Sequence, residues 1–297
     1  MIFINYYDEI KNELVNNEIT KKVKDYSKNR SDLTTYYNVG KLLAEAGKHY
    51  GEGIIKEYSK RLTNEFGTKF GITLLKRIRQ FYIVIEKGAT MSHQLSWSHY
   101  CELLPVNSID KINYYIKITK EQNLSIRELR TKIKNNEYER LDESTKEKLK
   151  EKEELKLPDL VKNPIQIKNT SGNNEISEKV LQKLILEDIP SFLDELGNGF
   201  TFVRNEYKIK IGDRYNYIDL LLFNYEFNCF VVVELKVSEL KKEHIGQIEF
   251  YMNYIDKNLK NINQNKTIGI IICKKENNYI IEYCSDDRIL AREYELI

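Results

Sequence analysis

The chain has 297 residues, more than one compact domain usually contains, so about two domains are expected. Its composition, 41% hydrophobic and 31% charged, is typical of a globular protein and excludes a disordered chain. It has no apolar run near the roughly 20 residues of a membrane span, and no secretory signal follows Met1, so we expect a cytoplasmic protein without membrane contact. The net charge of +2 excludes an argument for nucleic-acid binding from total charge, and local patches must carry it.

Residues 1–141 have the apolar spacing of helices. Ser125 and Glu128 form a capping-box pattern, which marks the start of one of them. Glycines such as Gly40 and Gly47 lie mostly between or at the ends of the periodic stretches, which indicates roughly five to seven short helices. We therefore predict a helical N-terminal domain over 1–141.

The periodicity degrades between residues 142 and 174. Lysine and glutamate alternate densely from Lys146 to Lys156, and Pro158, Pro164 and a polar stretch follow. We predict a charged linker over 142–174, either a solvated helical spacer or a flexible segment.

The pattern changes again over residues 175–297. Ile176 to Leu196 has helical spacing, and so has Lys241 to Lys260. Five segments rich in Val, Ile, Tyr and Phe are predicted strands: 200–211, 215–223, 229–237, 266–273 and 279–284. This order predicts a C-terminal α/β sandwich around a mixed central sheet.

Two of the predicted strands carry acids inside apolar runs. Asp219 precedes three leucines, and Glu234 and Lys236 share one face of the run that begins at Val231. If the loop between the strands is symmetric about its centre, Asp219 lies directly opposite Glu234. The sequence therefore predicts two neighbouring carboxylates with a lysine beside them.

Neighbouring carboxylates repel each other, and a divalent cation stabilises both at once. Oxygen ligands suit Mg²⁺ or Mn²⁺, which polarise a phosphate and lower the pKa of bound water, and a nearby ammonium can position that water. The alternative for Glu234 and Lys236 is a solvent-facing ion pair of small energetic consequence. The apolar neighbours of the three residues indicate burial and favour a hydrolytic site for phosphodiesters.

The spacing D-(x14)-E-x-K on consecutive strands resembles the PD-(D/E)xK nuclease superfamily. Longer segments resemble the YhcG-type family of bacterial nuclease-like proteins, in both halves of the chain: 36–40, 74–82, 95–100, 192–200, 218–223, 234–236, 246–251 and 268–273. The resemblance implies a restriction-endonuclease-like fold for 175–297 and a helix-turn-helix-like DNA-binding module for 1–141.

The resemblance also implies roles for single residues. Asp219 and Glu234 would hold the metal, and Lys236 would orient the attacking water. Glu178 matches an acid that many superfamily members add as a further metal contact, and a solvent-exposed helix glutamate is the equally open alternative.

Two further residues of the resemblance lie four apart on the predicted helix 241–260. Gln247 and Tyr251 would support the lysine and the phosphate, with helix packing or solvent exposure as the alternative. Glu206 and Ser238 depart from the family pattern, and we expect neither to touch the metal ligands.

Basic residues near aromatic ones are candidates for binding nucleic acid. Lys76, Arg77 and Arg79 lie close to Phe81 and Tyr82. This arrangement suits phosphate contact beside an aromatic anchor, and the alternative is a scaffold helix with a solvated basic face. Five further basic residues could line a groove beside the metal site: Lys208, Lys210, Arg214, Lys241 and Lys242.

These expectations together describe a Mg²⁺- or Mn²⁺-dependent DNA endonuclease, which the resemblance places in defence or DNA processing. Two alternatives remain open: a catalytically inactive nucleic-acid-binding or assembly protein with this fold, and an RNA-directed nuclease. A double-strand cut favours a homodimer. The resemblance also indicates partner proteins of a defence or recombination system.

Overall fold

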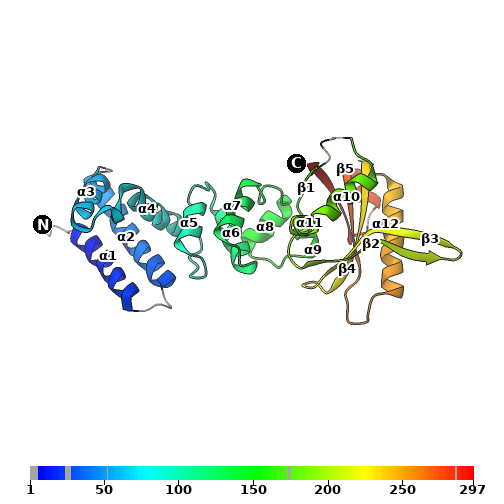
Figure 1. Cartoon of the computed structure of the whole chain (residues 1–297), viewed down its shortest axis with the longest axis horizontal. Helices are drawn as coiled ribbons and strands as arrows, with labels where there is room; N and C mark the ends of the chain where they lie inside the picture. Colours follow the sequence, from blue (N-terminus) through cyan, green and yellow to red (C-terminus); the bar gives the residue numbers. More distant parts are fainter. Residues whose placement is uncertain (1–5, 24–27, 52, 171, 173–174, 285) are drawn as a thin grey trace. The chain divides into compact units, whose positions relative to one another are not determined.

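The computed structural model of the chain describes residues 6–23, 28–51, 53–170, 172, 175–284 and 286–297. It divides into two compact units, Met1–Tyr138 and Glu139–Ile297. The N-terminal unit is helical and the C-terminal unit holds a sheet between helices, as the sequence predicts (Figure 1). The first five residues of the predicted helical domain lie outside the described residues. No helix of the described ranges is long and apolar enough to cross a membrane.

The N-terminal unit packs its helices around apolar side chains such as Leu43, Leu62 and Ile78, all fully buried. Ser125 caps one helix by accepting a hydrogen bond from the backbone nitrogen of Glu128, whose side chain returns one, so the predicted capping box is confirmed. The elements are α1 (Tyr6–Val23), α2 (Lys28–Tyr50), α3 (Ile54–Phe66), the 3₁₀ turn η1 (Thr68–Phe70), α4 (Ile72–Glu86), α5 (Trp97–Leu103), α6 (Ile109–Glu121) and α7 (Ile126–Lys134).

Gly40 lies in the middle of α2, so the prediction that a helix ends near it is wrong, whereas Gly47 lies in the last turn of that helix. At Gly40 the reason is a close approach of two helices. A Cβ atom there would lie 2.5 Å from the carbonyl oxygen of Ile78 and 2.6 Å from Cβ of Tyr82, both on α4. A missing side chain lets α2 and α4 touch, which offsets the low helix propensity of glycine.

The sheet of the C-terminal unit has the strand order β1-β6-β5-β4-β3-β2. β2, β3 and β4 pair antiparallel, whereas β4, β5, β6 and β1 pair parallel, so the sheet is mixed as predicted. Its strands are β1 (Ile165–Ile167), β2 (Phe200–Ile211), β3 (Arg214–Asn224), β4 (Cys229–Glu239), β5 (Ile268–Lys275) and β6 (Ile289–Leu296).

Helices cover both faces of this sheet (Figure 1). α10 (Glu178–Glu187) and α11 (Ile189–Leu196) pack on the face that includes Leu220, Val233 and Ile270. α12 (Lys242–Asn258) packs on the other face. The single helix predicted over 176–196 is two helices, because Asp188 ends the first and caps the second, which has Pro190 in its first turn.

The predicted linker 142–174 belongs largely to the C-terminal fold. It contains α8 (Glu143–Glu151), α9 (Leu157–Leu160) and β1, which pairs with β6. The Arg292 guanidinium of β6 donates hydrogen bonds to the carbonyl oxygens of Val161 and Pro158 and to the carboxylate of Asp142. The linker prediction is therefore wrong for this part, because buried contacts that are distant in sequence hold it to the sheet. Residues 171, 173 and 174 of the predicted linker lie outside the described residues.

The strand predicted at 279–284 is also wrong, because that segment lies in α13 (Asn278–Cys284). The backbone nitrogen of Ile280 donates a hydrogen bond to the Asn277 side chain, which supports the first turn. β5 and β6 run parallel, and parallel neighbours need a crossover connection between them. The strand that completes the sheet is β6, over Ile289–Leu296.

Candidate active site at the fork between two strands

The candidate site lies where β3 and β4 stop pairing, beyond Leu220 and Val233, and we call this place the fork. The paired register runs from Asn224↔Cys229 to Leu220↔Val233, which is the register that the sequence predicts. One residue further on, Asp219 Oδ2 accepts a hydrogen bond from the backbone nitrogen of Leu235 at 2.8 Å. A side-chain carboxylate thus takes over from the main-chain ladder, and it holds Asp219 beside Glu234.

The side-chain alternation of β3 is interrupted at the same point. Ile218 and Leu221 both pack into the cluster around α12, although residues three apart on a regular strand point to opposite faces. On β2, Glu206 lies between the pairs Asn205↔Leu220 and Tyr207↔Ile218, hence opposite Asp219, and its φ of 45° is left-handed. Glu206 is thus a cross-strand neighbour of Asp219 and its charge raises the pKa of that acid, while its side chain is exposed.

Glu234 is 2% exposed, and its two carboxylate oxygens have different surroundings. Oε2 accepts a hydrogen bond from Lys236 Nζ at 3.3 Å, whereas Oε1 is buried without a hydrogen-bond partner among the described residues. Burial, and next the charge of Asp219, raise the pKa of Glu234 to about 8, against the opposing effect of Lys236. Among the described residues, Oε1 of this buried carboxylate therefore lacks a hydrogen-bond partner, which is unfavourable.

Burial also raises the pKa of Asp219, and the charges of Glu178 and Glu206 add to this. Glu178 is exposed at the first residue of α10, where Ser177 caps the helix. Within the described ranges, no three His, Cys, Asp or Glu side chains are grouped so that they could hold one ion. The three carboxylates predicted as metal contacts are therefore not preassembled: Glu234 is buried, Asp219 is half-buried and Glu178 is exposed.

α12 brings further side chains toward the fork. Gln247 Nε2 donates a hydrogen bond to the hydroxyl of Tyr251 at 3.2 Å, and both residues lie on one face of the helix as predicted. Burial raises the pKa of Tyr251, and the charges of Glu234 and Asp219 raise it further. The hydroxyl therefore lies within electrostatic reach of both carboxylates.

Sequence reasoning missed two residues at the fork. Gln182 on α10 donates a hydrogen bond through Nε2 to the main-chain oxygen of Asp219 at 3.0 Å. Its spacing of four from Glu178, which puts both on one helix face, is the signal that could have found it. His244 is the second, because burial and then the charges of Lys236 and Lys241 lower its pKa.

The family models account for both units. One described as "YhcG PDDEXK nuclease domain" matches residues 158–297, and one described as "DUF1016 N-terminal domain" matches residues 9–140. The chain belongs to the YhcG-type family of PD-(D/E)xK nuclease-like proteins. Its C-terminal unit is a nuclease domain, and the fork carries Asp219, Glu234 and Lys236, the residues that the sequence resemblance assigns to its motif.

A curated relative from Escherichia coli (strain K12), named "Putative nuclease YhcG", is 26% identical over 95% of this chain and 88% of its own length. Two solved structures resemble 43% of the chain at 19% identity: a repair endonuclease from Pyrococcus abyssi, with a TM-score of 0.29, and an EndoMS complex with double-stranded DNA, with a TM-score of 0.31. These matches span about half of each solved chain, 50% and 49%.

The predicted nucleic-acid residues of the DUF1016 domain lie on α4. Lys76 and Arg77 are exposed and Arg79 is half-buried. Phe81 is fully buried, and its ring contacts those of Trp97 and Tyr100, so its predicted role as an aromatic anchor for nucleic acid is wrong. It follows the buried Leu75 and Ile78 at intervals of three residues, so it lies on the face of α4 that packs into the core.

The predicted basic residues of the nuclease domain are all exposed. Lys208 and Lys210 lie on β2, Arg214 begins β3, and Lys241 and Lys242 lie at the start of α12. Lys241 is close enough to the fork for its charge to lower the pKa of His244. The structure thus divides this group between the β2–β3 hairpin and the helix start beside the fork.

Proposed function

We propose that the chain is a metal-dependent endonuclease that hydrolyses phosphodiester bonds of DNA. One observation carries the proposal: Glu234, buried beside Asp219, has a carboxylate oxygen without a hydrogen-bond partner in the part of the chain that the structure describes. An uncompensated buried acid is costly, and such groups occur mainly where function requires them.

The residues present fit a divalent cation. Glu234 Oε1 is unengaged, and Asp219 uses Oδ2 for the nitrogen of Leu235, so each carboxylate keeps an oxygen for an ion. Mg²⁺ is usually held by one or two carboxylates with water in the remaining positions, which suits a site of two neighbouring acids. A bound Mg²⁺ or Mn²⁺ would polarise the phosphate and lower the pKa of a coordinated water.

The chain's own groups act around that centre. Lys236 donates to Glu234 and its ammonium can orient the attacking water or offset the charge that develops on the phosphate. Asp219 and Glu234 would hold the ion, and the exposed Glu178 would add a further contact through water. Gln247 and Tyr251, joined by a hydrogen bond, support the lysine and the phosphate from α12.

DNA is the proposed substrate, and exposed basic groups support it in both units. Lys76 and Arg77, with Arg79, suit phosphate contact by a helix-turn-helix-like N-terminal unit. The nuclease domain adds Lys208, Lys210, Arg214, Lys241 and Lys242. We further propose a cytoplasmic role in defence or DNA processing, with partner proteins of such a system and a homodimer for double-strand cuts.

Plasmid DNA incubated with the purified full chain tests the proposal. Nicking or linearisation is expected with Mg²⁺ or Mn²⁺ and not with EDTA, and Glu234→Ala should abolish it. Glu249→Gln is the matched control, because Glu249 is an exposed acid on α12 outside the site. Cleavage that needs no metal and survives Glu234→Ala would reject the mechanism.

Two further outcomes identify the alternatives. Metal-dependent cleavage of a matched RNA, with DNA left intact, would identify an RNA-directed nuclease. A protein that binds DNA but shows neither cleavage nor an Mn²⁺ affinity dependent on Asp219 would be an inactive binding or assembly protein. The complete set of Asp219, Glu234 and Lys236 at the fork favours turnover.

A further inference from the structure

The β2–β3 hairpin continues past the fork as a two-stranded arm. β4 pairs with β3 from Leu220 onward, whereas β2 pairs with β3 up to Ile211↔Arg214 at the turn. Figure 1 shows this hairpin projecting from the rest of the C-terminal unit. We call residues 207–218 the arm.

The two faces of the arm differ sharply. Ile209 and Ile218 are fully buried in the cluster that α12 covers. Side chains alternate along a strand, so the intervening residues lie on the outer face. There Tyr215 and Tyr217, each 51% exposed, are paired across the strands with Lys210 and Lys208.

The outer face combines aromatic rings with positive charge. The Lys208 ammonium lies 3.7 Å from the centroid of the Tyr215 ring. Lys208, Lys210 and Arg214 are opposed within the arm by Asp213 alone, which leaves a net charge of +2. Exposed rings interleaved with cations are the chemistry that binds single-stranded nucleic acid, because rings stack on bases while cations contact phosphates.

The arm leads away from the fork. Tyr217 and Tyr215 are two and four residues from Asp219 on the same strand, about 7 and 13 Å at the usual rise of a strand. At about 3.4 Å per phosphate of a stacked strand, this distance corresponds to roughly two to four nucleotides. A ring at that place can stack only on an unpaired base, because the faces of paired bases are covered by their neighbours.

We infer that the outer face of the arm, through Tyr215, Tyr217 and Lys208, binds unpaired nucleotides of single-stranded DNA next to the phosphate that is cut. This inference rests on the proposed nuclease function and specifies its substrate: DNA with a single-stranded segment beside the cleavage point. A fully paired duplex would meet the arm through its phosphates alone.

Binding measured without divalent cations tests the arm separately from cleavage. Fluorescein-labelled single-stranded DNA and a blunt duplex of the same sequence are titrated with the full chain and with Y215A/Y217A. Affinity for the single strand should fall about tenfold or more, since each stacked ring contributes substantially, and affinity for the duplex should change by less than about twofold. Y225A is the matched control, because Tyr225 is a 61% exposed tyrosine in the β3–β4 turn.

Two companion variants identify the interaction. Y215F/Y217F keeps the rings and should retain single-strand affinity, whereas K208Q should lower the dependence of log affinity on log salt by about 0.7. Unchanged single-strand affinity in Y215A/Y217A, or equal losses for single strand and duplex, would overturn the inference. Circular dichroism of each variant verifies that the fold is intact.

The outcome separates this inference from the nuclease proposal. Tyrosine-dependent single-strand binding without metal-dependent cleavage would leave the arm in place and reject the nuclease. Metal-dependent cleavage with tyrosine-independent binding would reject the arm and keep the nuclease. If both hold, a duplex with a single-stranded overhang should be cut faster than the blunt duplex, and Y215A/Y217A should remove that difference.

Discussion

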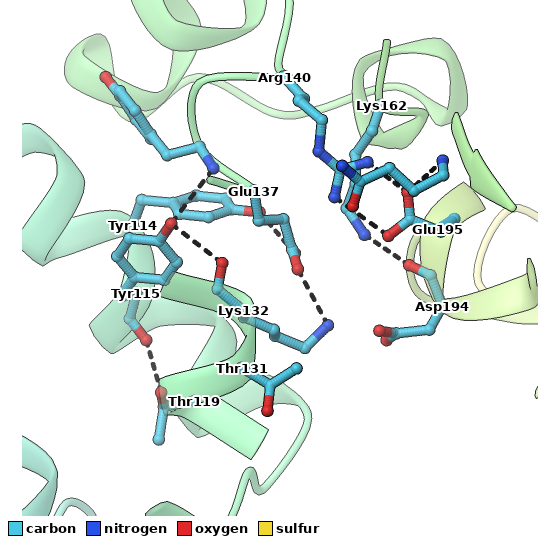
Figure 2. A network of polar contacts seen from close by, with 12 residues as sticks. Tyr114, Tyr115, Thr119, Thr131, Lys132, Glu137, Arg140, Lys162, Asp194 and Glu195 are labelled. Carbon is cyan, nitrogen blue, oxygen red and sulfur yellow. Dashed lines mark hydrogen bonds and ion pairs between the residues drawn. The ribbon is translucent and has the colours of Figure 1, made fainter. Parts of the chain in front are cut away.

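Two buried glutamates, one in each unit, are each paired with a lysine at nearly the same distance. Glu137 of the N-terminal unit lies 3.2 Å from Lys132, and Glu234 of the nuclease domain lies 3.3 Å from Lys236. The two glutamates differ in the hydrogen bonding of their other carboxylate oxygen, Oε1. Glu137 Oε1 accepts a hydrogen bond from the Tyr114 hydroxyl at 2.9 Å, as Figure 2 shows, whereas Glu234 Oε1 has no such partner among the described residues.

A third, partly buried acid follows the pattern of Glu137. Glu195 accepts hydrogen bonds from the Arg140 guanidinium on both oxygens (Figure 2). It accepts a further one from the backbone nitrogen of Gln166. The carboxylates of Glu137 and Glu195 are thus hydrogen-bonded on both oxygens, which is the pattern expected of a structural role. The incomplete set at Glu234, with a second acid beside it, distinguishes a site that needs a ligand.

The largest expected effect separates activity from stability at Glu234. Glu234→Gln should lower cleavage about 10³-fold or more, roughly 4 kcal/mol of transition-state stabilisation. The melting temperature in EDTA should not fall, because the substitution removes repulsion with Asp219. Plasmid cleavage and calorimetry of the same preparation measure both quantities. A large drop in melting temperature would show that Glu234 is a structural acid like Glu137.

Glu137→Gln should have the opposite profile. It leaves the Lys132 ammonium buried without its counter-charge, so the free energy of unfolding should fall by about 2–3 kcal/mol. Trp97 is the one tryptophan of the sequence and lies in the N-terminal unit, so its fluorescence in urea follows this unit alone. The exposed Glu57→Gln is the control, and cleavage by the folded variant should be unaffected. An unchanged urea midpoint would contradict the assigned role.

A smaller effect concerns metal affinity. Asp219→Asn should weaken Mn²⁺ binding about 10- to 100-fold or more, since one of two anionic ligands is lost. Isothermal titration of the full chain with Mn²⁺ measures it, beside Glu249→Gln as the exposed control. Equal affinities in the two variants would show that the ion binds elsewhere.

The smallest effect concerns Glu276. Like Glu137 and Glu195, this acid accepts a hydrogen bond from another side chain. Asn163 donates a hydrogen bond to it at 3.0 Å, yet burial, with the charges of Glu293 and Asp142, raises its pKa from 4.5 to about 7. A raised pKa means that the folded state binds the proton more tightly. The stabilisation is therefore fully present below about pH 4.5 and is lost as pH rises through 7.

Glu276→Gln should remove that part of the pH dependence. Because Glu276 is partly exposed, solvent screening reduces the expected difference between pH 4.5 and 8 to about 1 kcal/mol. The free energy of unfolding is measured by calorimetry, which detects both units. The nuclease domain contains no tryptophan, so the transition that is absent from Trp97 fluorescence belongs to this domain. The exposed Glu282→Gln on α13 is the control. A parallel pH profile for Glu276→Gln and the unmodified chain would contradict the prediction.

Local sequence patterns were enough for the hairpin and its acids. β3 and β4 contain apolar runs joined by a short turn, so the register that places Asp219 beside Glu234 follows from counting residues. The bounds of β2 and the capping box at Ser125 follow from similarly local rules. Interactions of this kind involve residues close in sequence, and their geometry is periodic.

Only the tertiary structure decided the rest. β1 and the buried Arg292 contacts draw the charged segment into the nuclease domain, and the crossover between parallel strands makes 278–284 a helix. Gln182 and Glu206 reach Asp219 from a different helix and strand, and Phe81 turns into the core. Each of these outcomes depends on partners distant along the chain, whose free energy of packing and hydrogen bonding outweighs the weak local preference of the segment.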